Sequence, residues 1–340
     1  MKYREAGVDI EAGEAFVNLI KPLVKKTFGP DVMTDLGSFG GVIRVTPAGH
    51  DTLLVASIDG VGTKMLLAAE HDRLDDVGRD LVHHCVNDIA VHGARPLLFL
   101  DYIGAGRLEP ERAARMVAGM ADACAAQGAA LLGGETAEMP GMYAEGHYDL
   151  VGAIVGTVAR ASFVDGSTIA AGDRLIGLAS DGLHTNGYSL ARRALFETGK
   201  HRPDDRPAEL GGKRLLDALL VPHRCYAPSL RAMITAGELK GAAHITGGGI
   251  EGNLARILPE GVDAAIDTDS WSIPPLFRII AAAGPVGEAE MFRAFNMGVG
   301  LVVAVGAAHE ATALDRLAAL GETAFALGRI VSGSGRVRLD

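Results

Sequence analysis

The chain has 340 residues, of which 48% are hydrophobic and 22% are charged, a composition that supports a packed core and excludes general disorder. Its formal net charge is −10, from 32 basic and 42 acidic residues, and it has no basic run, so we expect no nucleic-acid partner. No apolar run approaches the roughly 18–20 residues that span a bilayer. The charged N-terminus lacks an apolar signal-peptide core, and the three scattered cysteines suit a reducing compartment. We therefore expect a cytoplasmic protein without a membrane partner.

Short apolar, β-branched segments alternate with alanine-rich amphipathic segments, which predicts an α/β (α+β) protein. Strands are expected at 41–45, 53–58, 96–100, 129–132, 150–158, 174–179, 242–245, 262–266, 298–305 and 324–327. Helices are expected at 77–91, 111–126, 188–196, 224–236 and 308–319. Residues 160–172 (RASFVDGSTIAAG) are small, polar and turn-rich, and they separate two strong strands. We expect a domain boundary there, with one domain at 1–165 and a second at 166–340.

Several predicted strands end directly in polar or glycine-rich sequence. Asp59 follows one strand, residues 133–136 (GGET) follow another, and residues 181–186 (DGLHTN) and 246–249 (TGGG) follow two strands of the second half. Ligands of α/β sheets tend to bind beyond the carboxyl ends of strands. A single such ending is ordinarily a turn or a helix cap, but the repetition favours one shared binding site.

The segment 59–64 (DGVGTK) carries the richest of these signals. Gly60 and Gly62 let successive backbone N–H groups point at one anion, and Lys64 adds a positive charge near the next helix. The spacing is not that of a Walker A loop. The segment indicates a phosphate-binding loop, and the alternative is a turn with a solvated lysine.

Asp88 lies on the predicted helix 77–91, at the border of its apolar face. A buried carboxylate needs a partner. A metal ion shared with Asp59 would supply one, and a salt bridge or a cap is the alternative. The nearby His83 and His84 are adjacent rather than four residues apart, so they suit a zinc site poorly, and we interpret them as structural filler.

Residues 247–252 (GGGIEG) match the G-x-G-x-x-G pattern of dinucleotide-binding proteins. The helix that would follow breaks at Pro259 and the motif lies late in the chain, so a Rossmann dehydrogenase is disfavoured. The sequence has no nucleophile elbow, zinc-protease motif or EF-hand loop. Phosphate handling by backbone amides, a lysine and a carboxylate-held metal is the chemistry that remains.

Eight motifs, in order and at similar spacing, resemble the AIR synthetase family of phosphoribosylformylglycinamidine cyclo-ligases. They are AGVDIEAG (6–13), GSFGG (37–41), DGVGTK (59–64), VNDIAVHGARPLLFLDY (86–102), GGETAEMPGMY (133–143), SDGLHTNGYSL (180–190), HITGGG (244–249) and FRAFNMGVG (292–300). Together they cover nearly the whole chain. The sequence departs from the family pattern at Gly252, Ala255 and Ala294, which stand in place of a glutamate, a proline and a threonine. The departures put in doubt any role for those side chains.

The resemblance implies a two-domain, AIR-synthetase-like fold. The N-terminal domain would bind ATP and pair with that of a second chain, closing a β-barrel-like sheet in a homodimer, and the C-terminal domain would be α/β. The resemblance also implies the reaction: formylglycinamidine ribonucleotide and ATP give 5-aminoimidazole ribonucleotide, ADP and phosphate, in de novo purine biosynthesis. The γ-phosphoryl group of ATP would activate the formamide oxygen so that it leaves as phosphate. ATP and Mg²⁺ are the implied cofactors.

The resemblance and the residue chemistry together give each site residue an expected role. Asp59 and Asp88 would hold Mg²⁺. The ATP-binding residues would be Asp59, Gly60, Gly62, Thr63, Lys64, Asp88, Gly133, Gly134, Glu135 and Thr136. The substrate-binding residues would be His184, Asn186, Thr246, Gly247, Gly248 and Gly249. Asp59, Lys64 and His184 would act in catalysis, His184 in proton transfer because an imidazole titrates near neutral pH.

Two other classes of protein stay open at this point. A related kinase or synthetase would share the ATP site but act on a different acceptor, and the motifs GGETAEMPGMY and SDGLHTNG argue against it. A catalytically silent nucleotide-binding protein would release no ADP with any acceptor. The intact Asp59, Lys64 and Asp88 argue against that class.

Overall fold

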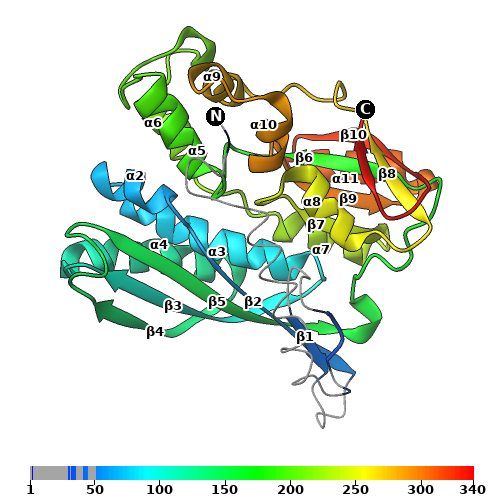
Figure 1. The fold of residues 1–340 in the computed structure, drawn as a ribbon. Helices are drawn as coiled ribbons and strands as arrows, with labels where there is room; N and C mark the ends of the chain where they lie inside the picture. The colour runs from blue at the N-terminus through cyan, green and yellow to red at the C-terminus, as the bar shows by residue number, and fades with distance from the viewer. Residues whose placement is uncertain (1, 3–29, 31, 36–40, 45–50) are drawn as a thin grey trace.

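The computed structural model describes residues 2, 30, 32–35, 41–44 and 51–340. Over these residues the chain forms two domains, each built on a mixed β-sheet with helices packed on it (Figure 1). The α/β (α+β) class and the two-domain arrangement are thus confirmed. None of the described helices is long and apolar enough to cross a membrane. The motif at 6–13 and most of the motif at 37–41 lie outside the described residues.

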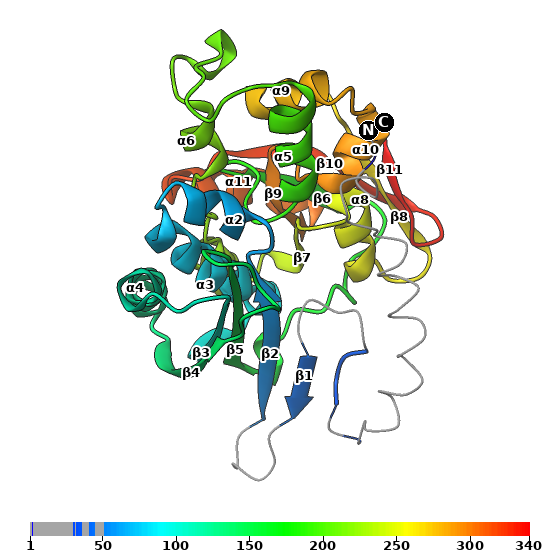
Figure 2. The same cartoon turned by 60° about the vertical axis from the view of Figure 1, so that its left-hand side comes forward.

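The N-terminal sheet has five strands in the order β1-β2-β5-β3-β4. They are β1 (Gly41–Arg44), β2 (Thr52–Gly60), β5 (Tyr148–Ala159), β3 (Arg95–Ala105) and β4 (Ala130–Glu138). The helices are α2 (Lys64–Glu70), α3 (Leu74–Ala90) and α4 (Pro110–Gln127). The pair β3–β4 is parallel and the others are antiparallel. Helix α3 lies between this sheet and the C-terminal domain (Figure 2).

Helix α4 has clear sequence signals at both ends, and it fixes the position of α3. Pro110 stands at its first position, where a missing N–H is tolerated, and Gly128 ends it with a φ of 72°. The two helices cross closely because each has a glycine at the crossing. A Cβ on Gly78 would collide with the carbonyl oxygen of Met116, and one on Gly119 with the backbone of α3. The close crossing holds α3 in the orientation that presents its polar side to the second domain.

The C-terminal sheet has six strands in the order β11-β8-β10-β6-β9-β7. They are β11 (Val337–Leu339), β8 (Val262–Ile266), β10 (Ala324–Ser332), β6 (Arg174–Ala179), β9 (Val299–Val305) and β7 (Leu239–His244). Its α-helices are α5 (Tyr188–Arg192), α6 (Leu215–Leu219), α7 (Ala227–Thr235), α8 (Gly249–Leu254), α9 (Pro275–Ala283), α10 (Glu288–Ala294) and α11 (Glu310–Ala319). Shorter helical segments are η2 (Arg160–Ser162), η3 (Arg193–Thr198), η4 (Ala208–Leu210), η5 (Ala255–Ile257) and η6 (Ala307–His309). Strand β9 (VGLVVAV) is buried along its whole length, as its unbroken apolar sequence predicts.

Each predicted strand and helix has a counterpart in the structure, with displaced ends. The prediction misses α2, α6, α8, α9, α10 and β11, because short segments leave little room for a recognisable period. The predicted domain boundary at 165/166 falls between the last strand of the first sheet, which ends at Ala159, and the first strand of the second, which begins at Arg174. The exact boundary stays a prediction.

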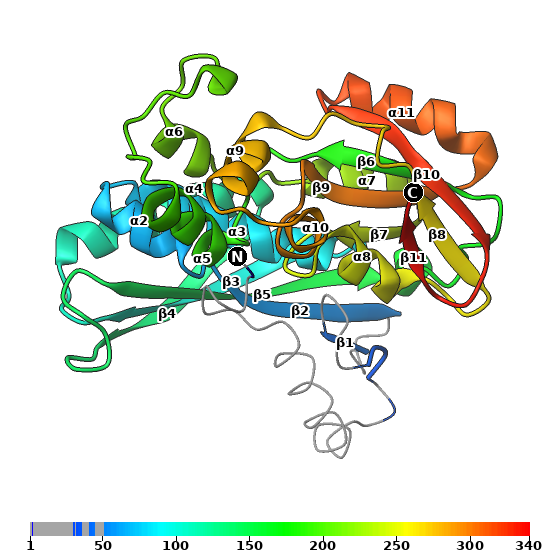
Figure 3. The ribbon, with the colours of Figure 1, turned by 45° about the horizontal axis from the view of Figure 1, so that its top comes forward.

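The two faces of the N-terminal sheet differ in what covers them. Ser57 and Asp59 on β2 bond to side chains of α3, so the intervening Ile58 points the other way. Ile58 pairs with Ala153 on β5, which pairs with Leu100 on β3, so the three lie in one row on that face. Ile58 is 69% exposed and Leu100 is 41% exposed. Figure 3 shows α2, α3 and α4 on the opposite side of the sheet. We refer to the surface formed by Ile58, Leu100, Leu132 and Ala153 as the open face.

Candidate active site

Helix α3 presents a polar strip to the C-terminal domain. Asp80, His84 and Asn87 repeat at intervals of four and three residues. His83 and Asp88 flank them, so the five side chains fall within about 140° of the helix circumference at 100° per residue. Burying polar groups is costly unless they find partners. Each of the five finds one across the domain boundary.

Lys64, at the start of α2, is completely buried beside this strip. Its Nζ lies 2.6 Å from Asp80 Oδ2 and donates a hydrogen bond to the carbonyl oxygen of Val221 at 2.9 Å. Asp80 Oδ1 accepts a hydrogen bond from the backbone N–H of His223 at 2.6 Å. Burial lowers the pKa of Lys64, and attraction to Asp80 opposes that shift. The sequence predicts that Lys64 binds ATP phosphates, but in the structure its ammonium has no exposed surface and is already paired.

Two more side chains of the strip hold the chain that follows Val221. Asn87 donates from Nδ2 to the carbonyl oxygen of Arg224 at 2.8 Å and accepts at Oδ1 from the N–H of Tyr226 at 2.8 Å. His83 donates from Nδ1 to the carbonyl oxygen of His223 at 2.6 Å. These bonds fix the backbone that carries His223, and therefore fix where its ring lies.

Asp59, at the end of β2, keeps one edge toward solvent. Its side chain is 40% exposed, whereas that of Asp88 is 8% exposed. Asp59 Oδ1 accepts from the N–H of Gly60 at 2.6 Å, and Oδ2 lies 2.9 Å from His84 Nε2. Burial acts to raise the pKa of Asp59, but His84 and the Gly60 N–H outweigh it and lower the pKa. The carboxylate is therefore ionised at neutral pH and accessible from one side.

The glycine-rich loop after Asp59 reaches the second domain. Gly62 has a φ of 54°, in the left-handed region that glycine adopts without strain. Thr63 Oγ1 is 2.9 Å from Ser189 Oγ on α5. The loop thus lies at the domain boundary, with an ionised carboxylate on one side and backbone N–H groups along it, which is an arrangement that suits a phosphate and its counter-cation.

A chain of hydrogen bonds runs from Asp59 into the C-terminal domain. His84 Nδ1 lies 2.6 Å from Thr185 Oγ1, which lies 3.4 Å from His223 Nδ1. Burial acts to lower the pKa of His84, but the carboxylates of Asp59 and Asp88 outweigh it and raise the pKa to about 9. Burial lowers the pKa of His223 well below its ordinary value. The first imidazole therefore carries a proton on each nitrogen at neutral pH, and the second is neutral.

The same chain returns to Asp88. His223 Nε2 is 2.9 Å from His244 Nε2, and His244 Nδ1 is 2.7 Å from Asp88 Oδ1. Asp88 Oδ2 accepts from Ser57 Oγ at 3.2 Å. The two aspartates are thus connected through side chains of both domains. We refer to His84, Thr185, His223 and His244 as the histidine chain.

His184 lies beside the histidine chain and is buried. Its φ of 61° is rare for a residue with a side chain, and its ring stacks on that of His223 with 4.0 Å between centroids. Its Nε2 accepts from the N–H of Asp181 at 3.3 Å. Burial lowers its pKa well below the ordinary value, and the charges of His244 and Lys64 lower it further. His184 is therefore neutral at pH 7, and its contact with substrate and its role in proton transfer stay predictions.

The loop at 246–249 follows β7 and is shaped by its glycines. A Cβ on Gly249 would collide with the carbonyl oxygen of Phe292, so only glycine fits there. The buried Asn253 donates from Nδ2 to the carbonyl oxygen of Gly249 at 2.8 Å and contacts Thr246 Oγ1 at 3.1 Å. Asn253 therefore fixes the loop from behind and leaves its other side free to face a ligand.

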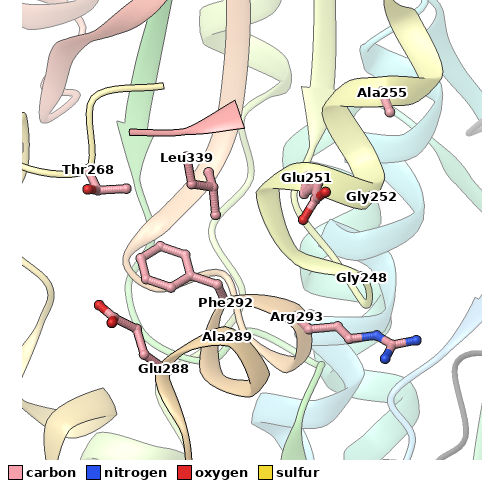
Figure 4. A pocket seen from close by; sticks show the side chains of 10 residues that line it. All are labelled: Gly248, Glu251, Gly252, Ala255, Thr268, Glu288, Ala289, Phe292, Arg293 and Leu339. Atoms are coloured by element: carbon pink, nitrogen blue, oxygen red, sulfur yellow. The ribbon is translucent and has the colours of Figure 1, made fainter. Parts of the chain in front are cut away.

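A cavity of about 780 Å³ opens beside this loop (Figure 4). Gly248 lines it, and helices α8 and α10 add Glu251, Phe292 and Arg293. Gly252 lines it as well, and a Cβ at that position would meet nothing within 4 Å. The absent glutamate at position 252 therefore leaves the cavity wider. Its volume is in the range of small-molecule sites.

Residues 133–136 do not join Asp59 within one chain. The sequence predicts them beyond the end of a strand, but they lie inside β4, at the edge of the sheet. Asp59 pairs with Gly152, which pairs with Asp101, which pairs with Gly134. This row crosses three strand spacings, or roughly 14 Å. Contact of residues 133–136 with ATP therefore stays a prediction. The distance to Asp59 of the same chain gives it no support.

The sequence analysis misses the histidines around the two aspartates. The interpretation of His84 as filler is wrong, because His84 contacts Asp59 and Thr185. A signal was visible, since His84 and Asp88 are four residues apart and therefore neighbours on one helix face. His223 and Thr185 carry no comparable signal, because only the packing of the two domains brings them to α3.

The fold and this interdomain site define the class of AIR synthase-like two-domain proteins. The family models "AIR synthase related protein, N-terminal domain" and "AIR synthase related protein, C-terminal domain" match residues 37–158 and 170–340. The chain belongs to this family. It is 50% identical over 333 residues to a phosphoribosylformylglycinamidine cyclo-ligase of Trichlorobacter lovleyi, covering 98% of this chain and 95% of that protein. It is 50% identical over 334 residues to the protein of the same name from Myxococcus xanthus, covering 98% and 96%.

Solved structures with the same fold are more distant in sequence. A thiamine-monophosphate kinase from Stenotrophomonas maltophilia superposes with a TM-score of 0.64 at 19% identity, covering 93% of each chain. The structure titled "AaThiL complexed with AMPPCP and TMP" superposes with a TM-score of 0.65 at 16% identity, covering 96% of this chain and 92% of that chain. At these identities the likeness concerns the fold alone.

Proposed function

We propose that the protein catalyses the ATP-dependent cyclisation of formylglycinamidine ribonucleotide to 5-aminoimidazole ribonucleotide, with release of ADP and phosphate. This is a ligase reaction of purine biosynthesis. The observation that carries the proposal is 50% identity over 98% of the chain with relatives that are named for this activity. The interdomain position of the 59–64 loop supports it.

The reaction needs no covalent nucleophile from the protein. The formamide oxygen attacks the γ-phosphorus of ATP, the bond to the bridging oxygen breaks, and ADP leaves. The amine then adds to the activated carbon, loses a proton, and the carbon–oxygen bond breaks to release phosphate. Holding the amine and the activated carbon in register supplies roughly 7–11 kcal/mol of the barrier reduction. The protein's task is therefore alignment and charge neutralisation.

The ATP phosphates are proposed to lie on the 59–64 loop, against Gly60, Gly62 and Thr63. Asp59 fits a Mg²⁺ ligand, because Mg²⁺ is usually bound by one or two carboxylates plus phosphate oxygens and water, and Asp59 is 40% exposed. Asp88 fits less well, because its two oxygens already accept from Ser57 and His244. When bound, Mg²⁺ would neutralise phosphate charge.

The ribonucleotide is proposed to contact the C-terminal domain at Asn186 and the 246–249 loop. Asn186 lies beside this loop, since a Cβ on Gly247 would be 3.4 Å from Asn186 Oδ1. The cavity lined by Gly248 supplies room for a small molecule. His184, two residues before Asn186, stacks on His223 with 4.0 Å between ring centroids, and its contact with the substrate stays part of the proposal.

The protein is also proposed to form a homodimer through the open face. Exposed contiguous apolar surface marks an interaction site, and Ile58 and Leu132 are 69% and 66% exposed. A second copy of the same sheet is the occupant that the family resemblance implies. A cytoplasmic location is proposed because Cys85, Cys124 and Cys225 are all free, as in compartments that keep thiols reduced.

A coupled assay for ADP tests the proposed function. The purified protein is given ATP, Mg²⁺ and either formylglycinamidine ribonucleotide, thiamine monophosphate or no acceptor, and the aminoimidazole product is measured separately. We expect ADP and product in equal amounts with the first acceptor only. ADP release with thiamine monophosphate would make the protein a kinase, and no release with any acceptor would make it a binding protein.

A further inference from the structure

We propose that a cavity between α2 and the segment from α5 to Pro203 is a binding site for a nucleoside monophosphate whose base carries an amino group. We refer to it as the α2–α5 cavity. Its volume is about 280 Å³, close to the lower end for small-molecule sites. It shares no lining residue with the cavity beside the 246–249 loop or with the histidine chain, so the site does not depend on the proposed function.

Both domains build the α2–α5 cavity. Helix α2 supplies one wall, and α5, η3 and the loop that follows η3 supply the other. Figures 1 and 3 show α2 beside α5, and Thr63 Oγ1, just before α2, lies 2.9 Å from Ser189 Oγ on α5. The lining residues are Leu67, Glu70, Arg192, Phe196, Glu197, His201, Arg202 and Pro203. The cavity therefore exists only when the two domains are packed together.

The chain after α5 turns back on itself through an unusual backbone. Residues 193–198 form a π-helical turn, a rare conformation that is frequent at functional sites. Lys200 has a φ of 56°, which is rare for a residue with a side chain. The N–H of His201 then donates to the carbonyl oxygen of Leu195 at 3.0 Å. This reversal brings Arg202 to the same cavity as Arg192 on α5.

Two guanidinium groups of the cavity have no acidic partner. Arg192 and Arg202 line it, and neither side chain makes a hydrogen bond or an ion pair with a residue that the structure describes. By contrast, the nearby Arg214 lies 3.1 Å from Asp204 and 2.8 Å from Asp217. A guanidinium binds a phosphate group through two parallel N–H donors. Two such groups at one cavity indicate an anion with several acceptor oxygens, which a phosphate monoester supplies.

The apolar part of the lining suits a planar base. Leu67 on α2 is buried, and Phe196 on η3 is half-buried. Nucleic-acid bases stack on aromatic side chains, and a leucine side chain can cover the opposite face of the same ring. The phosphate and the base would thus occupy different parts of one cavity.

The carboxylates of the cavity select the base and the number of phosphates. Glu70 lies on the same helix as Leu67 and is exposed, and an ionised carboxylate only accepts hydrogen bonds. It matches the amino group of a base such as guanine. Glu197 also lines the cavity, with its Oε2 4.0 Å from Arg193 Nε. Two carboxylates disfavour the greater negative charge of a triphosphate, so a monophosphate fits best.

A further cavity, of about 490 Å³, is a poorer phosphate site. It lies against β8 and β10, and Arg174, which lines it, is 3.3 Å from Glu310 on α11. Asp267, Asp269 and Asp340 line it as well. Carboxylates therefore dominate its lining, and they repel phosphate.

Isothermal titration calorimetry of the full-length protein without ATP tests the site with GMP, IMP, guanosine and inorganic phosphate. GMP and IMP differ only in the amino group on the base, and guanosine lacks the phosphate. We expect one GMP bound at the cavity per chain. IMP and guanosine should each bind about 10–100-fold more weakly than GMP, because each loses hydrogen bonds to a charged partner. Inorganic phosphate should also bind more weakly, because it has no ring to stack.

Arg192→Gln and Arg202→Gln locate the site. Each should weaken GMP binding about 10–100-fold and leave guanosine binding unchanged, a pattern that a folding defect would not produce. Glu70→Gln should reduce the difference between GMP and IMP. Arg206→Gln is the matched control, because Arg206 lies in the same loop but donates to the carbonyl oxygen of Gly212, outside the cavity. Its GMP binding should equal that of the wild type.

Three results would overturn the proposal. They are no saturable binding of GMP by the wild type, binding of IMP or inorganic phosphate as tight as that of GMP, and GMP binding that Arg192→Gln and Arg202→Gln leave unchanged. The last result would place the nucleotide at another site. None of these titrations uses the ADP assay, so the proposed function stands or fails separately.

Discussion

The polar strip of α3 and the open face lie on opposite sides of the N-terminal sheet layer and reverse the usual distribution of residues. The strip is charged yet buried, and each of its side chains has a hydrogen-bond partner in the other domain. The open face is apolar yet exposed, with Ile58 and Leu100 at its centre. The comparison teaches that polarity alone does not locate a site. The role of each surface depends on the partner that it meets. The strip meets the second domain, and the open face is proposed to meet a second chain.

The largest expected effect comes from removing the charge of Lys64, which pairs with Asp80 of the strip. Lys64→Met leaves the Asp80 carboxylate buried without its counter-charge, which costs about 3–5 kcal/mol of the free energy of unfolding. Denaturation in urea measures the change. The double variant Lys64→Met/Asp80→Asn should recover much of the loss, because the amide still accepts from the His223 N–H. If Lys64→Met is as stable as wild type and only raises the KM for ATP, Lys64 binds phosphate as the sequence predicts.

The next effect concerns Asp59, a carboxylate beside the strip that reaches solvent. Asp59→Asn should lower kcat/KM by roughly 100–1000-fold, as does the loss of one charge-stabilising group in other enzymes, about 2.7–4 kcal/mol. The fold should persist, because Asp59 is only half-buried. The ADP assay measures the change in kcat/KM, and circular dichroism shows whether the fold persists. Asp51→Asn, just before the other end of the same strand, is the matched control and should behave as wild type.

Breaking the open face should change assembly rather than chemistry. Leu100→Lys and Ile58→Lys each remove an apolar side chain worth about 1.5–3 kcal/mol when buried, so dimerisation should weaken about tenfold to a hundredfold. Light scattering after gel filtration measures the mass. Leu320→Lys is the control, because Leu320 is 49% exposed but belongs to the C-terminal domain. A monomeric wild type, or equal effects of all three variants, would refute a dimer through this face.

The smallest effect is expected at the cavity, outside both surfaces. Gly252→Ala fills open space at the C-terminal half of α8, and replacing glycine there should stabilise the fold by about 0.4–1 kcal/mol. Thermal denaturation measures the shift. A loss of stability would show that the backbone conformation at position 252 requires glycine. In that case the open space beside it would not be the reason that glycine is tolerated.

The sequence predicts the parts of the molecule that depend on local chemistry. Strand β9 and helix α4 follow from an unbroken apolar run and from Pro110 and Gly128. Asp59 and the glycine-rich loop follow from a strand that ends in DGVGTK. The histidine chain behind Asp59 does not follow, because Thr185 and His223 reach His84 on α3 only after the domains pack. For the same reason the sequence gives no sign that Lys64, which it predicts to bind phosphate, is buried.

The extent of the strands also escaped prediction. Strand β4 continues through residues 133–136, which look like a loop because they contain two glycines and a glutamate. Pairing with β3 holds them extended, through contacts such as Asp101 with Gly134. Such pairing depends on residues far apart in the chain, and glycine in a strand gives no local sign of it.

A structure of the protein with an ATP analogue and Mg²⁺ tests the central claim most directly. We predict triphosphate density along residues 60–63 with a cation on the exposed oxygen of Asp59. Triphosphate bound elsewhere, with Asp59 left to solvent and its histidine partner, would contradict it.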